Sequence, residues 1–201
     1  MIRKTLMSGI VTSALFAAAL APLGAQAAQQ TPQPKIVVID RSAVMRASKV
    51  GQDIVRQVNA YTDQAEKDLR GQGEALQRDG KAFQQQAAIL SAELKNRKLK
   101  ELEARRAGLQ AQAQKKQSLI QGGFVKARQQ VEQALGPILQ GIMAERGANL
   151  MLDRNSVVLG TVDVDITRLA VQRLDQKMPT LKVELTPLPP GMQQQQQQPQ
   201  Q

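Results

Sequence analysis

The chain has 201 residues and a formal net charge of +10, with 27 Lys and Arg residues against 17 Asp and Glu residues. It contains no histidine, cysteine or tryptophan, which excludes Ser-His triads, thiolate nucleophiles and disulfide bonds and disfavours a zinc site. Three Phe residues and one Tyr are too few to build a large core, so we expect several copies to share one core.

Residues 1–27 have the pattern of a secretory signal peptide. Arg3 and Lys4 form a charged start, an apolar run covers residues 10–20, and Ala25-Gln26-Ala27 gives the small-residue cleavage pattern. The apolar run is too short to span a bilayer. We therefore expect an exported product whose net charge falls from +10 to +8 when Arg3 and Lys4 are removed.

A short polar linker leads to a compact apolar run, Lys35-Ile-Val-Val-Ile-Asp40. The run is too short for a helix, and its continuous apolarity predicts a strand covered on both faces. Asp40 or Ser42 is expected to cap a short helix that carries Val44 and Met45.

Residues 51–147 are rich in Ala, Gln, Lys, Arg and Glu and contain no proline before Pro137, so they predict helix. A single helix of that length would extend about 145 Å at ~1.5 Å per residue, and the short flanks could not support it. We predict an antiparallel hairpin with its tip near residues 86–92, where Ser91 can cap the second helix.

Apolar residues recur every seven positions along both arms, which is coiled-coil spacing. The second apolar position of each heptad is weakly filled in the first arm, for example by Gln72 and Asp79, so the seam is expected to be thin. The predicted seam residues are Val55, Leu69, Leu76, Phe83 and Leu90 in the first arm and Phe124, Val131 and Ile138 in the second.

The second arm is strongly basic. Between residues 95 and 128 only Glu101 and Glu103 are acidic, so the local charge is +8. A solvated helix face of mixed charge would be nearly balanced, so this excess favours contact with acidic clients or anionic surfaces. The candidate contact residues are Lys95, Arg97, Lys98, Lys100, Arg105, Arg106, Lys115, Lys116, Lys126 and Arg128.

Glycines within the arms suggest a mid-arm hinge at Gly71, Gly73 and Gly108, because each glycine costs a helix ~1 kcal/mol relative to alanine. A bend between residues 90 and 91 would place Gly73 opposite Gly108, which predicts either a hinge or a close approach of the helices. Gly136-Pro137 should bend or loosen the second arm nearer its base.

Beyond the hairpin, residues 149–153 and 156–159 predict two strands joined by a tight β-hairpin. Asp163 or Asp165 should cap a helix that Pro179 ends, and residues 181–185 alternate as a last strand. Residues 187–201, rich in Pro and Gln, are expected to be disordered. Residues 35–50 and 148–186 would thus form a small β-rich body whose core, shared between copies, comprises Ile36, Val37, Val38, Ile39, Leu150, Leu152, Val157 and Leu159.

No pattern in the chain predicts a catalytic, metal-binding or cofactor-binding residue. The segment from Gly73 to Lys81 fails as a phosphate-binding loop, because six residues separate Gly73 from Gly80 where four are required. Asp163 and Asp165 could hold a metal, but helix capping is the favoured interpretation because a helical pattern follows directly. No aromatic interleaving marks a nucleic-acid surface, so we expect neither an enzyme nor a nucleic-acid partner.

The order of parts resembles the Skp (OmpH-like) family of periplasmic chaperones. The resemblance is carried by the strand at residues 35–40, Ser48-Lys-Val-Gly51 leading into a long charged hairpin, and a Leu90-Ser-Ala-Glu-Leu94 tip. Leu150-Met-Leu-Asp153 and Asp165-Ile-Thr167 follow in the same order. It covers nearly all of the chain between the signal peptide and the Gln-rich tail.

The resemblance implies an α+β, predominantly α fold: a helical hairpin rooted in a small β-sheet body that forms a shared barrel in a homotrimer. It implies a periplasmic holdase that binds unfolded outer-membrane proteins between its arms without ATP or any other cofactor. Some members bind lipopolysaccharide through basic residues, but here Gly122-Gly123 occupies the place where such residues would be expected.

Two other readings stay open from the sequence. The hairpin could belong to a structural spacer or adaptor of the cell envelope, although that class has larger β domains flanking the hairpin. Alternatively, the basic arm could bind an anionic membrane surface, a role that is compatible with the chaperone reading. The client range, the role of the tail and the permanence of the trimer do not follow from the sequence.

Overall fold

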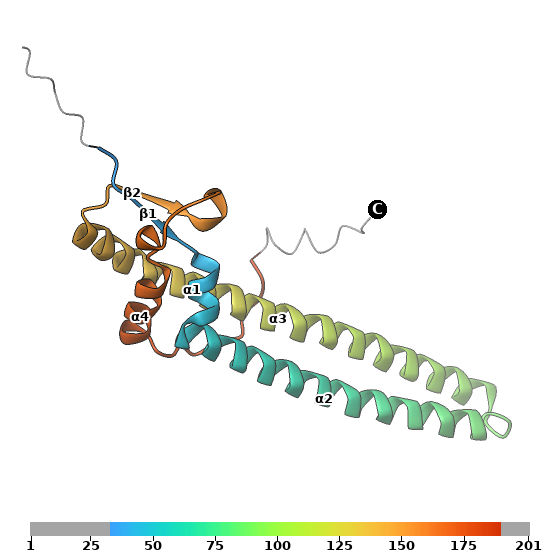
Figure 1. Cartoon of the computed structure of the whole chain (residues 1–201). Coiled ribbons are helices and arrows are strands. Elements are labelled where there is room, and N and C mark those ends of the chain that lie inside the picture. Colours follow the sequence, from blue (N-terminus) through green and yellow to red (C-terminus); the bar gives the residue numbers. More distant parts are fainter. Residues whose placement is uncertain (1–32, 190–201) are drawn as a thin grey trace, which may run out of the picture. The chain divides into compact units, whose positions relative to one another are not determined.

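The computed structural model describes residues 33–189 (Figure 1). The predicted signal peptide and the tail from residue 190 lie outside this range. Within it, two long helices form an arm and all other elements gather at the base of that arm as a small body. The elements are β1 (Ile36–Ile39), α1 (Arg41–Ala47), α2 (Lys49–Gln86), α3 (Ala92–Arg146), β2 (Leu150–Asp153), η1 (Arg154–Ser156), η2 (Val162–Val164) and α4 (Thr167–Lys177).

Each of the helices α1, α2 and α3 begins at a residue whose side chain caps it. Asp40 accepts a hydrogen bond from the amide of Ala43 at 2.7 Å and starts α1. Ser48 and Ser91 cap α2 and α3 through the amides three residues further on, which satisfies otherwise unpaired donors. Gly147 ends α3 with φ at 61°, a left-handed conformation in which glycine carries no Cβ penalty.

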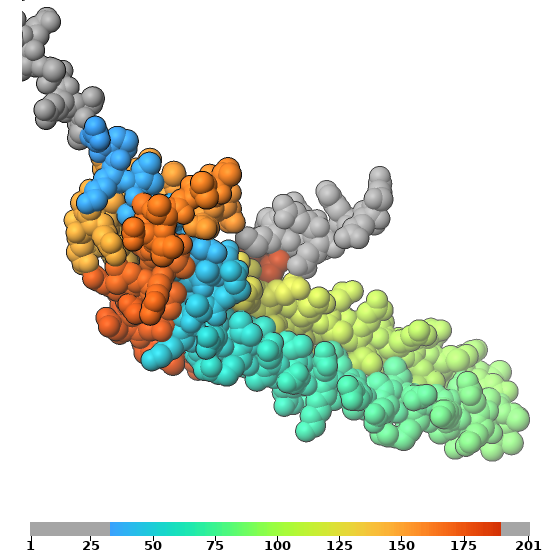
Figure 2. Space-filling view, viewed as in Figure 1, coloured from blue at the N-terminus to red at the C-terminus, as the bar shows by residue number. Residues whose placement is uncertain are grey.

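The two long helices run antiparallel side by side, as predicted, and are joined by the turn at residues 87–91 (Figures 1 and 2). α2 has 38 residues and α3 has 55, and α3 continues through Pro137 without a break. The longer helix extends past the base of α2 into the body. The hairpin and the body therefore share α3 as one continuous rod.

The predicted seam is shifted by one residue at the base of the arm. Ile54 is 1% exposed, whereas the predicted Val55 is 50% exposed. The shift arises because α1 folds back over the start of α2 and the buried face follows those contacts rather than the heptad count. Further along, Leu69 and Leu76 are half-buried, and on α3 Val131 is fully buried.

The sheet is a pair of parallel strands, so the predicted β-hairpin at residues 149–159 is wrong. Ile36 pairs with Leu150 and Ile39 pairs with Asp153. Asp153 accepts a hydrogen bond from the amide of Asn155 at 3.0 Å and starts a 3₁₀ turn, so the chain leaves the sheet instead of reversing. β2 finds its partner in β1, across the whole hairpin.

α4 covers the inner face of β1 and the base of the arm. The N-cap position of α4 is Ile166, which makes no side-chain cap hydrogen bond, so the predicted capping by Asp163 or Asp165 is wrong. Asp165, one residue earlier, accepts a hydrogen bond from the amide of Thr167 at 2.9 Å. Ile166, Ala170 and Leu174 are each 1% exposed or less. They join β1, α1 and both arm helices in one core, and this core fixes the direction in which the arm leaves the body.

Residues 178–189, which we call the C-terminal strap, form no strand, so the strand predicted at residues 181–185 is wrong. The strap is extended and lies on the bases of α2 and α3. Val183 is 1% exposed and Leu188 is 5% exposed, so the disorder predicted from residue 187 is also wrong as far as residue 189. Apolar and polar residues do alternate in this segment, but the buried side chain packs against α2 and α3 instead of within a sheet.

Candidate functional site

All ten predicted basic contact residues lie on α3, and six of them form ion pairs. Two of these pairs join the arms: Arg105 with Asp79 at 2.6 Å and Lys116 with Asp68 at 2.9 Å. The other four pairs are Arg97 with Glu93, Lys98 with Glu101, Lys126 with Glu184 and Arg128 with Glu132. The excess positive charge of this arm is therefore concentrated on the four that pair with no acidic residue of the described chain, Lys95, Lys100, Arg106 and Lys115.

The ion pairs between the arms stand at the surface. Both partners of the Arg105–Asp79 pair are about half exposed, so the pair is open to screening by salt. Hydrogen bonds from Lys116 and Gln64 hold the pKa of Asp68 below its ordinary value. These contacts set the register of the two arms but contribute little to stability.

The seam between the arms is thin over most of its length. No residue from 66 to 121 is fully buried, whereas Ala65 and Gly122 at the two ends of this stretch are. Near the tip an open cleft of about 370 Å³ lies between the helices, with Phe83, Leu94 and Leu102 among its lining. A second cleft of about 240 Å³ lies around Leu76 and Leu109. Apolar side chains in the outer arm thus stay accessible beside charged ones.

The predicted hinge glycines lie in unbroken helix. A Cβ added at Gly71 or Gly108 would meet no atom within 4 Å, and one at Gly73 would lie 3.9 Å from Leu109. No close approach of the helices therefore explains these glycines. Gly73 faces Leu109 instead of the predicted Gly108, because the arms pair a few residues out of the predicted register.

The predicted body core divides into a buried and an exposed set. Val37, Val38 and Ile39 are at most 4% exposed, and Leu152 and Val157 are half-buried. The remaining predicted residues are exposed in the single chain, namely Ile36 at 37%, Leu150 at 42% and Leu159 at 93%.

An exposed apolar loop is a feature that sequence analysis missed. Val158, Leu159 and Val162 are 88% exposed or more and lie between the end of η1 and the start of η2. The sequence signal was present, because apolar residues in a loop are unusual, but the predicted strand concealed it. Together with Ile36 and Leu150 these residues leave apolar surface uncovered at the sheet end of the body.

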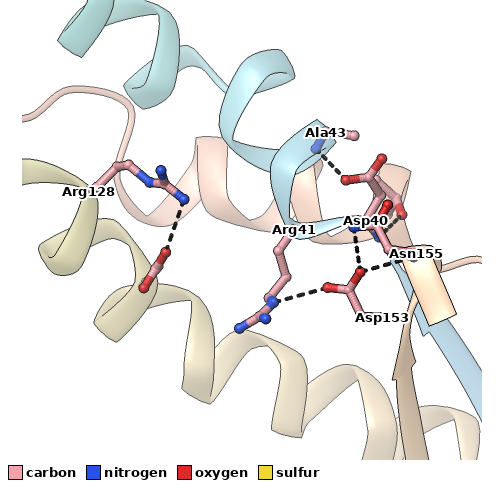
Figure 3. Close-up of polar contacts among 8 residues, drawn as sticks. Asp40, Arg41, Ala43, Arg128, Asp153 and Asn155 are labelled. Atoms are coloured by element: carbon pink, nitrogen blue, oxygen red, sulfur yellow. Dashed lines mark hydrogen bonds and ion pairs between the residues drawn. The ribbon is translucent and has the colours of Figure 1, made fainter. Parts of the chain in front are cut away.

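A polar cleft of about 350 Å³ lies between α1 and α3 and was not predicted (Figure 3). Arg41 and Arg128 line it, and each is paired with a carboxylate, Arg41 with Asp153 at 3.3 Å and Arg128 with Glu132 at 3.6 Å. Hydrogen bonds from Asn155 and Arg41 lower the pKa of Asp153. The charges in the cleft balance, which makes it a structural joint between the body and the arm.

Nothing in this arrangement resembles a catalytic centre. In residues 33–189 no three Asp or Glu side chains come together as metal ligands would. Asp163 and Asp165 stand on the two sides of a turn, and Asp165 is engaged with Thr167 and Arg154. No helix of the described chain is both long enough and apolar enough to cross a membrane.

Comparison with known proteins matches the chain to a family model and to several solved structures. Residues 35–174 match the model of the family described as outer membrane protein (OmpH-like). The chain is also similar to the crystal structure of a candidate outer membrane chaperone (OmpH-like) from Caulobacter crescentus CB15. The TM-score is 0.74 at 23% identity, and the similarity covers 77% of this chain and 92% of that one. No curated protein matches the chain significantly.

Proposed function

The chain belongs to the OmpH-like outer membrane protein family, and from this premise we propose that it is an ATP-independent chaperone of the periplasm. It holds unfolded outer-membrane proteins between its arms and prevents their aggregation on the way to the outer membrane. The role is one of binding, without catalysis. The similar protein from Caulobacter crescentus is itself described as a candidate outer membrane chaperone.

The observation that carries this proposal is the open construction of the outer arm. From residue 66 to residue 121 no side chain is fully buried, so the arm is held by few contacts and can adapt its shape. Its apolar side chains stay within reach of a client while charged neighbours keep the surface soluble. Many weak contacts of this kind hold an unfolded chain and still release it.

Four unpaired cations give the arm its electrostatic preference. Lys95, Lys100, Arg106 and Lys115 stand on the outer half of α3, away from the body. Their field favours acidic clients or anionic surfaces, including lipopolysaccharide, and weakens as salt rises. We propose these four as the strongest electrostatic contacts among the ten basic residues.

The uncovered surface of the body supports assembly into a homotrimer. A two-stranded sheet is marginal alone, and among residues 33–189 β2 pairs only with β1, which leaves its outer edge open within that range. The exposed apolar residues Ile36, Leu150, Val158, Leu159 and Val162 lie at this end of the body. We propose that three copies close their sheets into one barrel, which covers the strand edges and this apolar surface together.

We also propose that Gly71, Gly73 and Gly108 form a hinge in the middle of the arm. Each lowers the local helix stability by ~1 kcal/mol relative to alanine, and no crowding at these positions requires a glycine. The hinge lets the outer half of each arm move against its base and adjusts the cavity to the size of the client.

The test is aggregation of an unfolded outer-membrane porin after dilution from urea, followed by light scattering without nucleotide. The protein should suppress aggregation at one trimer per porin, more strongly at low salt than at high salt. Replacing Lys95, Lys100, Arg106 and Lys115 by glutamine should weaken suppression at low salt. The matched control replaces the same number of exposed cations in the body and strap, Arg146, Arg168, Lys177 and Lys182.

Each outcome bears on a separate part of the proposal. A failure of the unmodified protein to suppress aggregation at any salt concentration would refute the holdase role. Equal weakening by the arm and control variants would show that total charge matters and not its position. The mass of the protein in solution, measured by multi-angle light scattering, should be three chain masses.

A further inference from the structure

The C-terminal strap is held by hydrogen bonds to its main-chain atoms, which do not depend on the strap's own side chains. Gln57 on α2 forms two hydrogen bonds to it: its side-chain nitrogen donates to the carbonyl of Leu181 at 2.7 Å, and its oxygen accepts from the amide of Val183 at 2.9 Å. Tyr61 donates to the carbonyl of Val183 at 3.2 Å. From the other side, the carbonyl of Leu119 accepts the amide of Thr186 at 3.3 Å.

The floor of this groove is made by two glycines of α3. A Cβ at Gly122 would lie 2.0 Å from the carbonyl oxygen of Thr186, and one at Gly123 would lie 2.8 Å from that of Glu184. Any side chain at these positions would push an extended main chain out. This explains why Gly122-Gly123 stands here in place of basic residues: the helix surface is cleared for a polypeptide backbone.

Side-chain recognition in the groove is sparse and apolar. Val183 is almost fully buried, whereas Leu185, two residues further along, is 45% exposed. Glu184 points outward to Lys126, with which it pairs at 2.7 Å at the surface. Main-chain hydrogen bonds combined with a pocket for an alternate side chain are the means by which proteins bind extended peptides of varied sequence.

The strap lies beyond the part of the chain that the family model matches. The family match ends at residue 174, before the strap begins, while α2 and α3, which form the groove, lie within the matched range.

We propose that this groove is a binding site for an extended client segment and that the strap occupies it in cis. The inference rests on the proposed function, because transmembrane strands of outer-membrane barrels are about ten residues long and alternate apolar with polar side chains. The strap has the same alternation at residues 181–185. A client held between the arms is at high local concentration, and it exchanges with the strap at the base of the arm.

The affinity of the groove for a client depends on how often the strap leaves the groove. The apparent affinity of the groove for a client is reduced by the fraction of molecules in which the groove is free. The surface ion pair between Lys126 and Glu184 weakens with salt, whereas the buried Val183 contact does not. Releasing the strap should therefore raise the affinity for a peptide, and raising the salt should do so slightly.

The experiment uses the full chain and a fluorescein-labelled peptide of ten alternating residues taken from an outer-membrane barrel strand, read by anisotropy. Val183→Asp places a carboxylate where the strap is buried and frees the groove, so peptide affinity should rise about tenfold. Adding Gly122→Ala to that variant should abolish the gain, because the new methyl group blocks the main chain of any occupant. The matched control is Gly136→Ala, also within α3, where a Cβ meets no atom within 4 Å.

A second measurement does not depend on the fold of the Val183 variant. The chain has no cysteine, so Lys126→Cys with Glu184→Cys supplies one pair of thiols that a short bis-maleimide can join. Cross-linking should lower peptide affinity below that of the uncross-linked protein. Unchanged affinity after cross-linking, or a gain in Val183→Asp that Gly122→Ala leaves intact, would overturn the inference.

The two proposals fail separately in these assays. Loss of the holdase role would appear as porin aggregation in the presence of the unmodified protein. Loss of the groove would appear in the peptide titrations, while suppression of porin aggregation continued.

Discussion

Gly51→Ala is the substitution whose effect the structure predicts most sharply. Helix propensity alone predicts that it stabilises the protein, whereas the packing around Gly51 predicts that it destabilises it. In an open helix the change stabilises by up to ~1 kcal/mol. Here the new Cβ would lie 1.7 Å from the carbonyl oxygen of Met45 and 3.1 Å from the Ser48 hydroxyl. Gly51 is the point at which α2 passes directly beneath the last turn of α1.

The size of the destabilisation follows from the shift of α1 that the new Cβ requires. Ordinary contact begins at 3.4 Å, so α1 must shift by about 1.7 Å, far more than a packed core absorbs. The shift partly uncovers Val44, which is 1% exposed, at a cost of about 1.5–3 kcal/mol. It also disturbs the Ser48 cap, worth ~1 kcal/mol. After the helix gain is subtracted, we expect a net destabilisation of about 2–3 kcal/mol.

The assay is urea unfolding followed by circular dichroism at a fixed protein concentration, since assembly makes stability depend on concentration. Gly136→Ala is the matched control, because no atom lies within 4 Å of its Cβ position. We expect the control to be neutral or stabilised and Gly51→Ala to unfold at lower urea, with Tm lower by about 5–10 °C. Stabilisation of both variants alike would refute the assigned packing of α1 on α2.

Three further predictions concern the strap, α4 and the arm. Val183→Ala should destabilise by about 2 kcal/mol because two buried methyl groups are lost, whereas Leu185→Ala, at a position 45% exposed, should change the urea midpoint little. Arg173 lowers the pKa of Glu145, so this pair stabilises above the ordinary Glu pKa of about 4.3 and is lost as the pH falls through the lowered value. Arg173→Gln should accordingly flatten the decline of the urea midpoint below that pH, and an unchanged acid profile would contradict the assignment. Alanine at all three hinge glycines should slow amide hydrogen exchange in the outer arm, and equal exchange rates in variant and parent would remove the hinge.

The local features of this fold could be predicted because their causes are local. Asp40, Ser48 and Ser91 each cap a helix through the amide three residues ahead, and such a pairing is legible in a short window of sequence. The hairpin likewise follows from composition, length and the uncharged stretch that contains Ser91.

The features that were predicted wrongly depend on partners far away in the chain. β2 was assigned to a hairpin with the residues that follow it, but it pairs with β1, whose residues precede it by 114 positions, as for Ile36 and Leu150. The strap has the alternation of a strand, yet its partners are side chains of α2 and glycines of α3. Ile54 replaces Val55 in the seam because α1 folds over the base of the arm, a contact that heptad counting cannot anticipate.

The parallel pairing of β1 with β2 has a consequence for the order in which the protein folds. A polypeptide is synthesised from its N-terminus, so β1 is present before β2 and stays unpaired until the hairpin has been made. Closing so long a loop is costly, and the antiparallel pairing of the two arms, which are joined by the turn at residues 87–91, brings the two strands to the same place. We therefore expect the hairpin to act as the template on which the two-stranded sheet forms, and its length to set the delay during which β1 is open to wrong partners.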